Sequence, residues 1–261
     1  MSVILIVGAS KGIGLETAQQ LRQGGHTVIG TSRKPADDSL LPLDVTDESS
    51  IDYFMSLLQG QMLDVMVYSA GYDLYSAAED TSMDDLYAQI DANFLGAVRM
   101  TRAVLPKLRE QGGGKLIFLS SLGGLNALPF NSAYSASKFA LEGYVESLRY
   151  ELIPLNIFVS LIVPGQVRTK TLATSIQSVK RPSHYGVSSI QLAEKARQAG
   201  EQAKLAPEAV AQLIVDVIEN PRPRLRYLVG TQARLVVALR TWLPERLFES
   251  FIMRQFVKPV L

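Results

Sequence analysis

The stretch that decides the fold is residues 3–14, Val-Ile-Leu-Ile-Val-Gly-Ala-Ser-Lys-Gly-Ile-Gly, near the start of the 261-residue chain. Its first five residues are apolar and mostly β-branched, which predicts a buried strand at Val3–Val7. Residues 13–23 have the pattern of a helix, closed by Gly24 and Gly25. Glycines between a strand and a helix let the backbone approach a pyrophosphate, which the positive helix N-terminus attracts. The stretch therefore predicts a dinucleotide site.

The glycines of this turn, Gly8, Gly12 and Gly14, are spaced Gly-x3-Gly-x-Gly, unlike the usual Gly-x-Gly-x-x-Gly. The same residues fit Gly-x-Ser-x-Gly, with Ser10 as the nucleophile of a serine hydrolase. That alternative requires an acid and then a histidine later in the chain, and only His184, in a polar segment, could serve. A nucleophile elbow also normally follows several strands, whereas this turn follows the first. Its position favours the dinucleotide site.

Downstream of the turn, short apolar runs alternate with segments of helical length. This pattern predicts an α/β fold of the doubly wound, Rossmann type, with a parallel sheet of about seven strands and a ligand crevice outside the carboxyl ends of the strands. We expect one domain over residues 1–261. Further strands are expected at residues 27–30, 40–43, 65–68, 116–119, 157–163 and 225–229. Helices are expected from residue 47, with Thr46 as the N-cap, and from Ser82 to residue 108, where Ser82 and Asp85 form a capping box. Three more helices are expected at 133–152, at 190–204 and from Pro207 to residue 219.

Composition excludes several classes of site and partner. The chain has 26 basic and 25 acidic residues, so it has no overall attraction to nucleic acid. It has no cysteine and only two histidines, which excludes thiolate chemistry and argues against a metal centre. No targeting segment or membrane span is evident, and we expect a cytoplasmic protein that acts on a small molecule.

Three residues near the middle of the chain point to acid–base chemistry. Tyr134 and Lys138 lie four apart on an expected helix and therefore share one face. A free tyrosine has a pKa of about 10, and an ammonium nearby favours the phenolate and lowers that pKa. Ser121, at the carboxyl end of an expected strand, could hydrogen-bond the same substrate oxygen. Taken alone, a Tyr-x3-Lys pair is common on amphipathic helices.

Taken together with the glycine turn, these residues resemble the short-chain dehydrogenase/reductase family over about the first 170 residues. The resemblance implies that Tyr134 is the general acid or base, that Lys138 holds the nicotinamide ribose, and that Ser121 orients the carbonyl or hydroxyl. Asn93 would support a proton-relay water. The resemblance implies cofactor contacts for Gly8, Ser10, Lys11, Gly12, Ile13, Gly14, Arg33, Asp44, Val45, Ser69, Ala70, Gly71, Asn93, Tyr134, Lys138, Pro164, Gly165, Val167 and Thr169. One departure is Tyr68-Ser69, where the family has Asn-Asn.

The end of the second expected strand predicts which dinucleotide binds. An acid there would accept hydrogen bonds from the ribose of NAD, whereas an arginine accommodates the 2′-phosphate of NADP. Here Arg33 follows that strand, no acid precedes Asp37, and Lys11 can approach the same ribose. We therefore expect NADP in preference to NAD.

The last hundred residues carry less information. Residues 166–206 match the family's substrate lid, within which His184 and Tyr185 are expected at the surface. Residues 231–261 form two amphipathic helices broken at Pro244, which we expect to cover the core, with a pocket roof or a membrane contact as alternatives. Such C-termini look like those of family members acting on bulky lipophilic alcohols and ketones, and Leu122, Leu125 and Leu128 would add an apolar wall.

The resemblance also implies a homodimer or homotetramer. Besides the serine hydrolase, a second alternative to an oxidoreductase is a non-catalytic dinucleotide sensor.

Overall fold

The structure is a computed structural model of the chain, and it describes residues 1–168 and 186–257. A single sheet of seven parallel strands runs through its centre in the order β3-β2-β1-β4-β5-β6-β7. This order reverses direction at β1, which confirms the predicted doubly wound, Rossmann-type sheet. The strands are β1 Val3–Val7, β2 Thr27–Ser32, β3 Leu40–Pro42, β4 Val65–Tyr68, β5 Gly114–Leu119, β6 Ile157–Pro164 and β7 Arg226–Val229.

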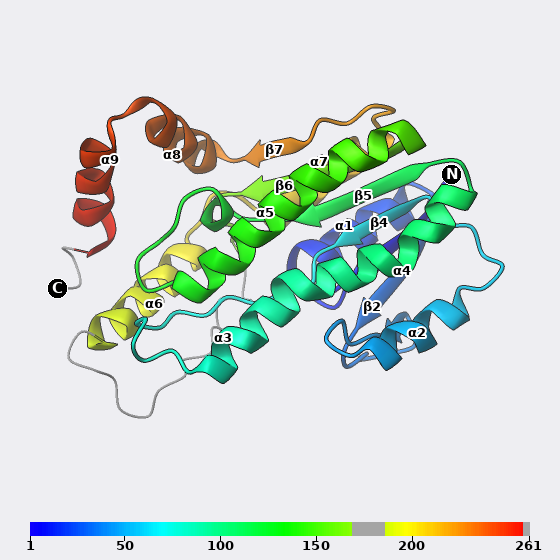
Figure 1. The fold of residues 1–261 in the computed structure, drawn as a ribbon, viewed down its shortest axis with the longest axis horizontal. Helices are drawn as coiled ribbons and strands as arrows, with labels where there is room; N and C mark the ends of the chain where they lie inside the picture. The colour runs from blue at the N-terminus through cyan, green and yellow to red at the C-terminus, as the bar shows by residue number, and fades with distance from the viewer. Residues whose placement is uncertain (169–185, 258–261) are drawn as a thin grey trace.

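Helices cover both faces of this sheet (Figure 1). In the described ranges the α-helices are α1 Gly12–Gln23, α2 Glu48–Leu57, α3 Met83–Ile90, α4 Gly96–Glu110, α5 Ser132–Leu152, α6 Gly186–Glu201, α7 Pro207–Glu219, α8 Thr231–Trp242 and α9 Glu245–Ile252. A π-helical turn, Asp91–Leu95, joins α3 to α4, so the helix predicted from Ser82 is continuous but locally widened. The helix predicted at 190–204 is found four residues earlier at its start and three at its end, as α6.

Strand residues alternate between two cores because successive side chains point to opposite faces of a sheet. Leu5 and Val7 pack with α2, α4 and α5, whereas Ile4 and Ile6 pack with α1 and α7. Both faces are therefore apolar, which is why the strands are continuous hydrophobic runs in the sequence.

Side-chain caps set where two helices begin. Ser82 accepts a hydrogen bond from the backbone N–H of Asp85, as predicted. The predicted cap of α2 is wrong: Asp47, not Thr46, caps that helix by accepting from the N–H of Ser49 at 2.9 Å. The reason is local, because the Thr46 hydroxyl donates instead to the Asp44 carboxylate at 2.7 Å.

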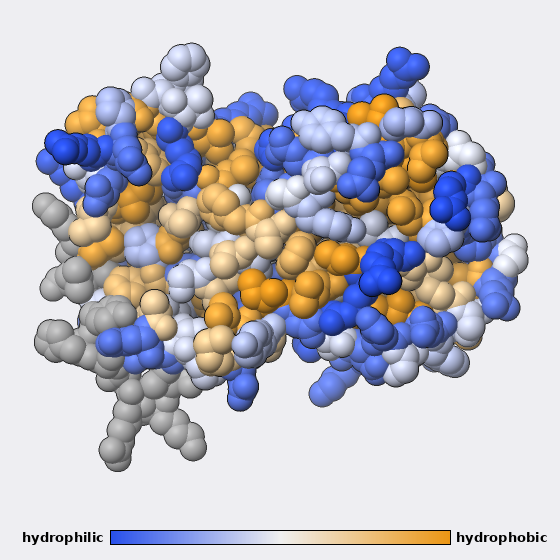
Figure 2. Space-filling model, viewed as in Figure 1, coloured by the Kyte–Doolittle hydropathy of each residue, from blue (hydrophilic) through white to orange (hydrophobic). Residues whose placement is uncertain are grey.

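The C-terminal helices lie beyond the carboxyl ends of β6 and β7, at the same end of the molecule as α6 (Figure 1). They are separated at Pro244, as predicted. Figure 2 shows apolar side chains at this end of the molecule, intermixed with charged ones. Across residues 1–168 and 186–257, every helix is too short or too polar to cross a bilayer.

Candidate active site

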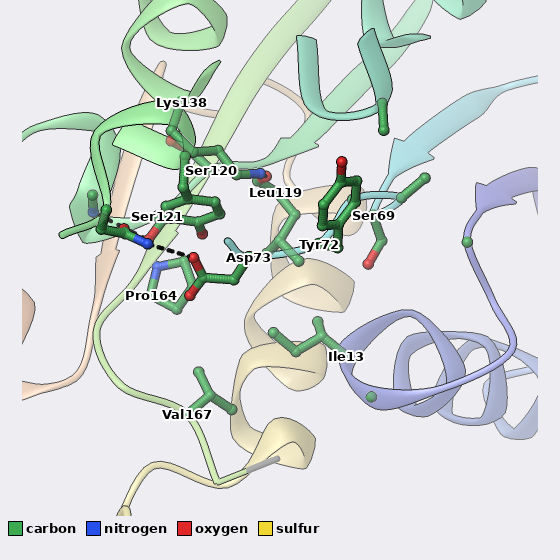
Figure 3. A pocket seen from close by; sticks show the side chains of 18 of the residues that line it. Ile13, Ser69, Tyr72, Asp73, Leu119, Ser120, Ser121, Lys138, Pro164 and Val167 are labelled. Atoms are coloured by element: carbon green, nitrogen blue, oxygen red, sulfur yellow. Dashed lines mark hydrogen bonds between the residues drawn. The ribbon is translucent and has the colours of Figure 1, made fainter. Parts of the chain in front are cut away.

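A cleft of about 1680 Å³ lies at the carboxyl ends of the strands, where the fold predicts the ligand crevice. Residues from the β1–α1 turn, the ends of β2, β4, β5 and β6, and helices α5, α6 and α8 line it. Figure 3 shows Ser121 and Lys138 on one side of this cleft and Ile13, from the glycine turn, on another. Of the predicted cofactor contacts, the cleft is lined by Gly8, Ser10, Lys11, Gly12, Ile13, Arg33, Asp44, Val45, Ser69, Ala70, Gly71, Tyr134, Lys138, Pro164, Gly165 and Val167.

The glycine turn forms a cradle that fits a pyrophosphate. Gly8 has φ +88°, and a Cβ atom added to it would lie 2.8 Å from the backbone nitrogen of Ala70. A Cβ on Gly14 would lie 2.2 Å from the carbonyl oxygen of Gly8. Helix α1 begins here with no side-chain cap and no acid in its first turn, so its N–H groups and positive end are free for an anion. Glycine at these two positions is therefore required for the turn to pack against Ala70 and against itself, and the turn leaves the start of α1 open to a phosphate.

The tyrosine, lysine and serine predicted from the sequence converge at the carboxyl end of β5. Ser121 caps a short 3₁₀ turn, Leu122–Gly124, and its hydroxyl hydrogen-bonds Tyr134. The ammonium of Lys138 lies 5.8 Å from the centroid of the Tyr134 ring and donates to the carbonyl of Leu119 at 2.9 Å. The turn is held close to the tyrosine, because a Cβ on Gly123 would lie 3.0 Å from Cε1 of Tyr134.

Burial has the largest effect on the pKa values of Tyr134 and Lys138. It raises the pKa of the Tyr134 phenol above its usual range, the charge of Asp73 raises it further, and the Ser121 hydrogen bond opposes both. Burial lowers the pKa of Lys138 to about 8, against the attraction of Asp73 and Glu142. The expected lowering of the tyrosine pKa by Lys138 is therefore not found in this structure. The Lys138 ammonium is directed at the Leu119 carbonyl, away from the phenol oxygen. The desolvation of the Tyr134 phenol therefore has a larger effect on its pKa than the charge of Lys138.

Asn93 lies behind the cleft wall, in the π-helical turn between α3 and α4, and is fully buried. Its amide donates to the carbonyl of Tyr72 and to the hydroxyl of Ser137, each at 3.0 Å, and its oxygen accepts from the N–H of Tyr72. Asn93 thus ties the loop after β4 to α5, the helix that carries Tyr134. Like Gly14, it is absent from the cleft lining.

Tyr68, the departure from the family pattern, serves the core. It is 1% exposed, and its hydroxyl donates to the carbonyl of Ala92 at 2.7 Å, within the same π-helical turn. Burial raises the pKa of this phenol far above its usual range, so it remains a neutral donor. The unusual residue thus anchors β4 to the widened helix.

Lys11 and Arg33 both line the cleft and are exposed. In the described part of the chain, neither forms an ion pair. Asp44 is held in place, because its carboxylate accepts from both the N–H and the hydroxyl of Thr46. Lys11, in the β1–α1 turn, and Arg33, just after β2, therefore line the cleft without an ion-pair partner among those residues.

Several residues that line the cleft were not predicted from the sequence. Asp73, two positions after Gly71, lines the wall beside the tyrosine, and a charged residue just after a strand end was a signal that could have found it. Gln255 and Phe256 line the cleft too, so the C-terminal segment does more than cover the core and contributes to the roof. Leu122 and Leu128 line the wall as expected, but Leu125 packs against the large core instead. Thr169, His184 and Tyr185 lie outside the described residues.

Comparison with known proteins decides the family. Residues 2–180 match the family described as short chain dehydrogenase. The chain is 35% identical over 256 residues to the 3-ketodihydrosphingosine reductase of Bacteroides thetaiotaomicron, covering 95% of each chain. It is 34% identical to retinol dehydrogenase 8 of Bos taurus, covering 92% of this chain and 85% of that one. The chain belongs to the short-chain dehydrogenase/reductase family.

Solved structures of this short-chain dehydrogenase/reductase family share the fold. A short-chain dehydrogenase from Streptomyces avermitilis has a TM-score of 0.80 at 29% identity, covering 95% of this chain and 98% of its own. Two family structures at 20% identity, from Burkholderia cenocepacia and Burkholderia phymatum, have TM-scores of 0.75 and 0.76 and are complexes with NADP and NAD respectively. Membership of this family supports an oxidoreductase and lends no support to Ser10 as a hydrolase nucleophile.

Proposed function

We propose that this short-chain dehydrogenase/reductase uses NADP(H) to interconvert a bulky lipophilic ketone and its secondary alcohol. The observation that carries this proposal is the convergence of Tyr134, Ser121 and Lys138 on a large cleft whose adjoining wall includes Leu122, Leu128 and further apolar side chains. A pocket that is mostly apolar with a few convergent polar groups is typical of a small-molecule site.

The polar groups suit proton transfer to a carbonyl oxygen. In reduction, the hydroxyls of Ser121 and Tyr134 would donate hydrogen bonds to that oxygen and hold it near the tyrosine. Tyr134 then gives its proton to the oxygen while the carbonyl carbon gains a hydride, and in oxidation it takes the proton back. The nicotinamide, when bound, supplies or accepts the hydride. The raised pKa of Tyr134 keeps the phenol protonated and ready to donate.

Other residues would hold the dinucleotide and place its nicotinamide ring next to Tyr134. The glycine cradle and the open N-terminus of α1 suit the pyrophosphate. Lys138 has three donors and uses one on Leu119, so two donors remain for ribose hydroxyls. Lys11 and Arg33 support a choice of NADP, because a charge-assisted hydrogen bond to the 2′-phosphate contributes about 1.5–3 kcal/mol. A sensor without catalysis would not need Tyr134 as a proton donor.

The outward face of α4 and α5 supports self-association as a dimer or tetramer. Leu95, in the π-helical turn that precedes α4, is 38% exposed, and Phe139 on α5 is 40% exposed. Figure 2 shows an apolar band across the region that α4 and α5 occupy in Figure 1. Light scattering at working concentration tests this part of the proposal, and a monomer would contradict it.

The proposed reaction is tested with a panel of ketones from four carbons to steroid size, offered with NADPH and with NADH. Oxidation of the reduced nicotinamide is followed by its absorbance. We expect turnover that increases in efficiency with the apolar size of the ketone and that prefers NADPH. Tight cofactor binding with no turnover of any ketone would favour the sensor and contradict the proposal.

A further inference from the structure

Asp73 has no part in the proton transfer proposed above, yet its carboxylate lies in the same wall of the cleft. It belongs to the loop between β4 and α3 and accepts a hydrogen bond from the side-chain amide of Asn131 at 2.7 Å (Figure 3). The amide of Asn131 also donates to the carbonyl of Leu74 at 3.0 Å. The Tyr75 hydroxyl and the N–H of Leu74 hydrogen-bond the carboxylate as well. Asp73 is thus held in a fixed position.

The charge of this carboxylate lacks a close counter-ion. In the described ranges, no lysine, arginine or histidine lies within salt-bridge distance of Asp73. Lys138 attracts it from further away, while its ammonium donates to the Leu119 carbonyl. Burial raises the pKa of Asp73 to about 6, so the group is still ionised at neutral pH. A carboxylate removed from water without a counter-ion is costly, and a cation in the cleft would offset that cost.

A second acceptor lies in the same wall. Asn131 is 1% exposed, and within the described residues its side-chain oxygen has no hydrogen-bond donor. A buried acceptor left without a donor is uncommon and requires an explanation. An ammonium group carries three donors and no acceptor, so it suits a wall that offers a carboxylate and an amide oxygen. A hydroxyl carries one donor and no charge, and it would leave the Asp73 charge uncompensated.

We propose that the substrate carries an ammonium group close to its reacting carbonyl or hydroxyl, and that Asp73, with Asn131, binds it. Asp73 lines the same cleft as Ser121 and Tyr134 and lies beside Ser121 in Figure 3, which puts the ammonium on the side of the cleft where the carbonyl would react. The apolar remainder of the substrate would contact the wall formed by Leu122 and Leu128. The substrate class is therefore an amphiphilic amino ketone or amino alcohol. This inference rests on the proposed oxidoreductase function and specifies its substrate.

The test compares three ketones that differ at one carbon: 2-aminodecan-3-one as its ammonium salt, 2-hydroxydecan-3-one and decan-3-one. Catalytic efficiency with NADPH is measured for each at neutral pH. We expect the ammonium ketone to exceed decan-3-one by about ten- to a hundredfold, mostly through a lower KM, because one charge-assisted hydrogen bond has that effect. Equal efficiency for all three, or equal gains from the hydroxyl and the ammonium, would overturn the proposal.

Asp73→Asn keeps the size of the side chain and removes its charge. Because all three ketones use the same tyrosine, an effect of this substitution on Tyr134 cancels in the ratio of efficiencies. We expect the ammonium-to-plain ratio to fall at least tenfold in Asp73→Asn and to be largely retained in Asp73→Glu. An unchanged ratio in Asp73→Asn would show that Asp73 does not bind the ammonium, and the proposal would fail.

The two proposals fail in different ways. If none of the three ketones and no larger ketone is reduced by the unmodified protein, the oxidoreductase function itself is contradicted. If plain ketones are reduced but the ammonium gives no advantage, only the assignment of Asp73 is contradicted. Binding of NADPH, followed by its fluorescence, and the melting temperature of Asp73→Asn show whether the variant is folded and takes the cofactor.

Discussion

The ammonium of Lys138 lies 5.8 Å from the centroid of the Tyr134 ring, one helical turn away on α5. It is directed at the Leu119 carbonyl and not at the phenol oxygen. The hydroxyl of Ser121 is the group that hydrogen-bonds the phenol. Lys138 therefore joins the carboxyl end of β5 to the helix that carries the tyrosine, and Ser121 and Tyr134 together form the candidate binding point for a substrate oxygen.

Replacing Tyr134 with phenylalanine should remove the proton donor and leave the cleft intact. We expect kcat to fall by about 10²- to 10⁴-fold, because that is the usual contribution of one positioned acid–base group. The affinity for NADPH, measured by fluorescence titration, should stay within a few-fold of the unmodified value. Wild-type turnover in Tyr134→Phe would show that another group is the general acid.

Replacing Arg33 with aspartate should change the preferred dinucleotide. The unmodified enzyme is expected to prefer NADPH by about ten- to a hundredfold, from one charge-assisted hydrogen bond. Arg33→Asp should lower or reverse that ratio of catalytic efficiencies, because the carboxylate repels the 2′-phosphate. Arg102→Asp, at an exposed position of α4 outside the cleft lining, makes the same charge change and should leave the ratio unaltered. Equal efficiency with NADH in the unmodified enzyme would refute the assignment.

Gly14→Ala should lower both the stability of the fold and the affinity for the cofactor. Its Cβ would lie 2.2 Å from the carbonyl oxygen of Gly8, so the start of α1 must move. We expect the free energy of unfolding to fall by about 1–3 kcal/mol, as for other overpacked sites, and NADPH binding to weaken.

Gly143 provides the matched control for this change. It lies inside α5, and nothing lies within 4 Å of a Cβ added there. Gly143→Ala should therefore stabilise the protein by about 0.4–1 kcal/mol, because alanine lowers the conformational entropy of the unfolded chain and makes no clash in the folded one. Chemical denaturation of both variants tests the pair, and equal effects would contradict the cradle described here.

The buried carboxyl of Asp73 should make stability depend on pH. Its pKa is about 6 in the folded protein and 3.8 when unfolded, so the folded state binds more protons between these values. Stability therefore falls as pH rises from about 4 to about 6, by on the order of 1–3 kcal/mol. Asp73→Asn lacks this group, so its free energy of unfolding relative to wild type should increase over the same interval.

Asp47 is the control for this pH effect, because hydrogen bonds from Ser49 lower its pKa. Its contribution to stability is present above pH 3.8 and is lost as pH falls below that value. As pH rises to about 3.8, the free energy of unfolding of Asp47→Asn should therefore fall relative to wild type. This change is opposite in direction to the one expected for Asp73→Asn. Denaturant unfolding from below pH 3.8 up to neutral pH measures both variants, and parallel curves for Asp73→Asn and wild type between pH 4 and 6 would contradict the first expectation.

Shortening Phe256 should affect large substrates selectively. Phe256 lines the cleft from the C-terminal segment, whereas Leu247 on α9 is 57% exposed and does not line it. Phe256→Ala should raise KM for ten-carbon and steroid-sized ketones by about tenfold, from the loss of about 1–2 kcal/mol of apolar contact, and leave butanone unchanged. Leu247→Ala should change neither. An equal rise for butanone would show that Phe256 does not form part of the roof.

The sequence alone was sufficient for the fold and for the residues that depend on local geometry. Val3–Val7 and the glycines after it are recognisable because strand periodicity and tight turns depend on neighbouring residues. Tyr134 and Lys138 are recognisable because residues four apart on a helix share a face in any protein. The cap of α2 was missed by one residue, because Asp44 and Asp47 both compete for nearby hydroxyl and N–H groups.

Only the tertiary structure decided which distant residues complete the site. Asp73 and Asn131 come from separate loops, and Phe256 from the last turns of the chain, yet all three line one cleft. Loops have no periodicity from which a side chain's direction follows, and contacts between residues far apart in the sequence form only when the sheet and its helices pack. The same packing removes Asp73 and Tyr134 from water and raises both pKa values, which no pattern of residue types along the chain encodes.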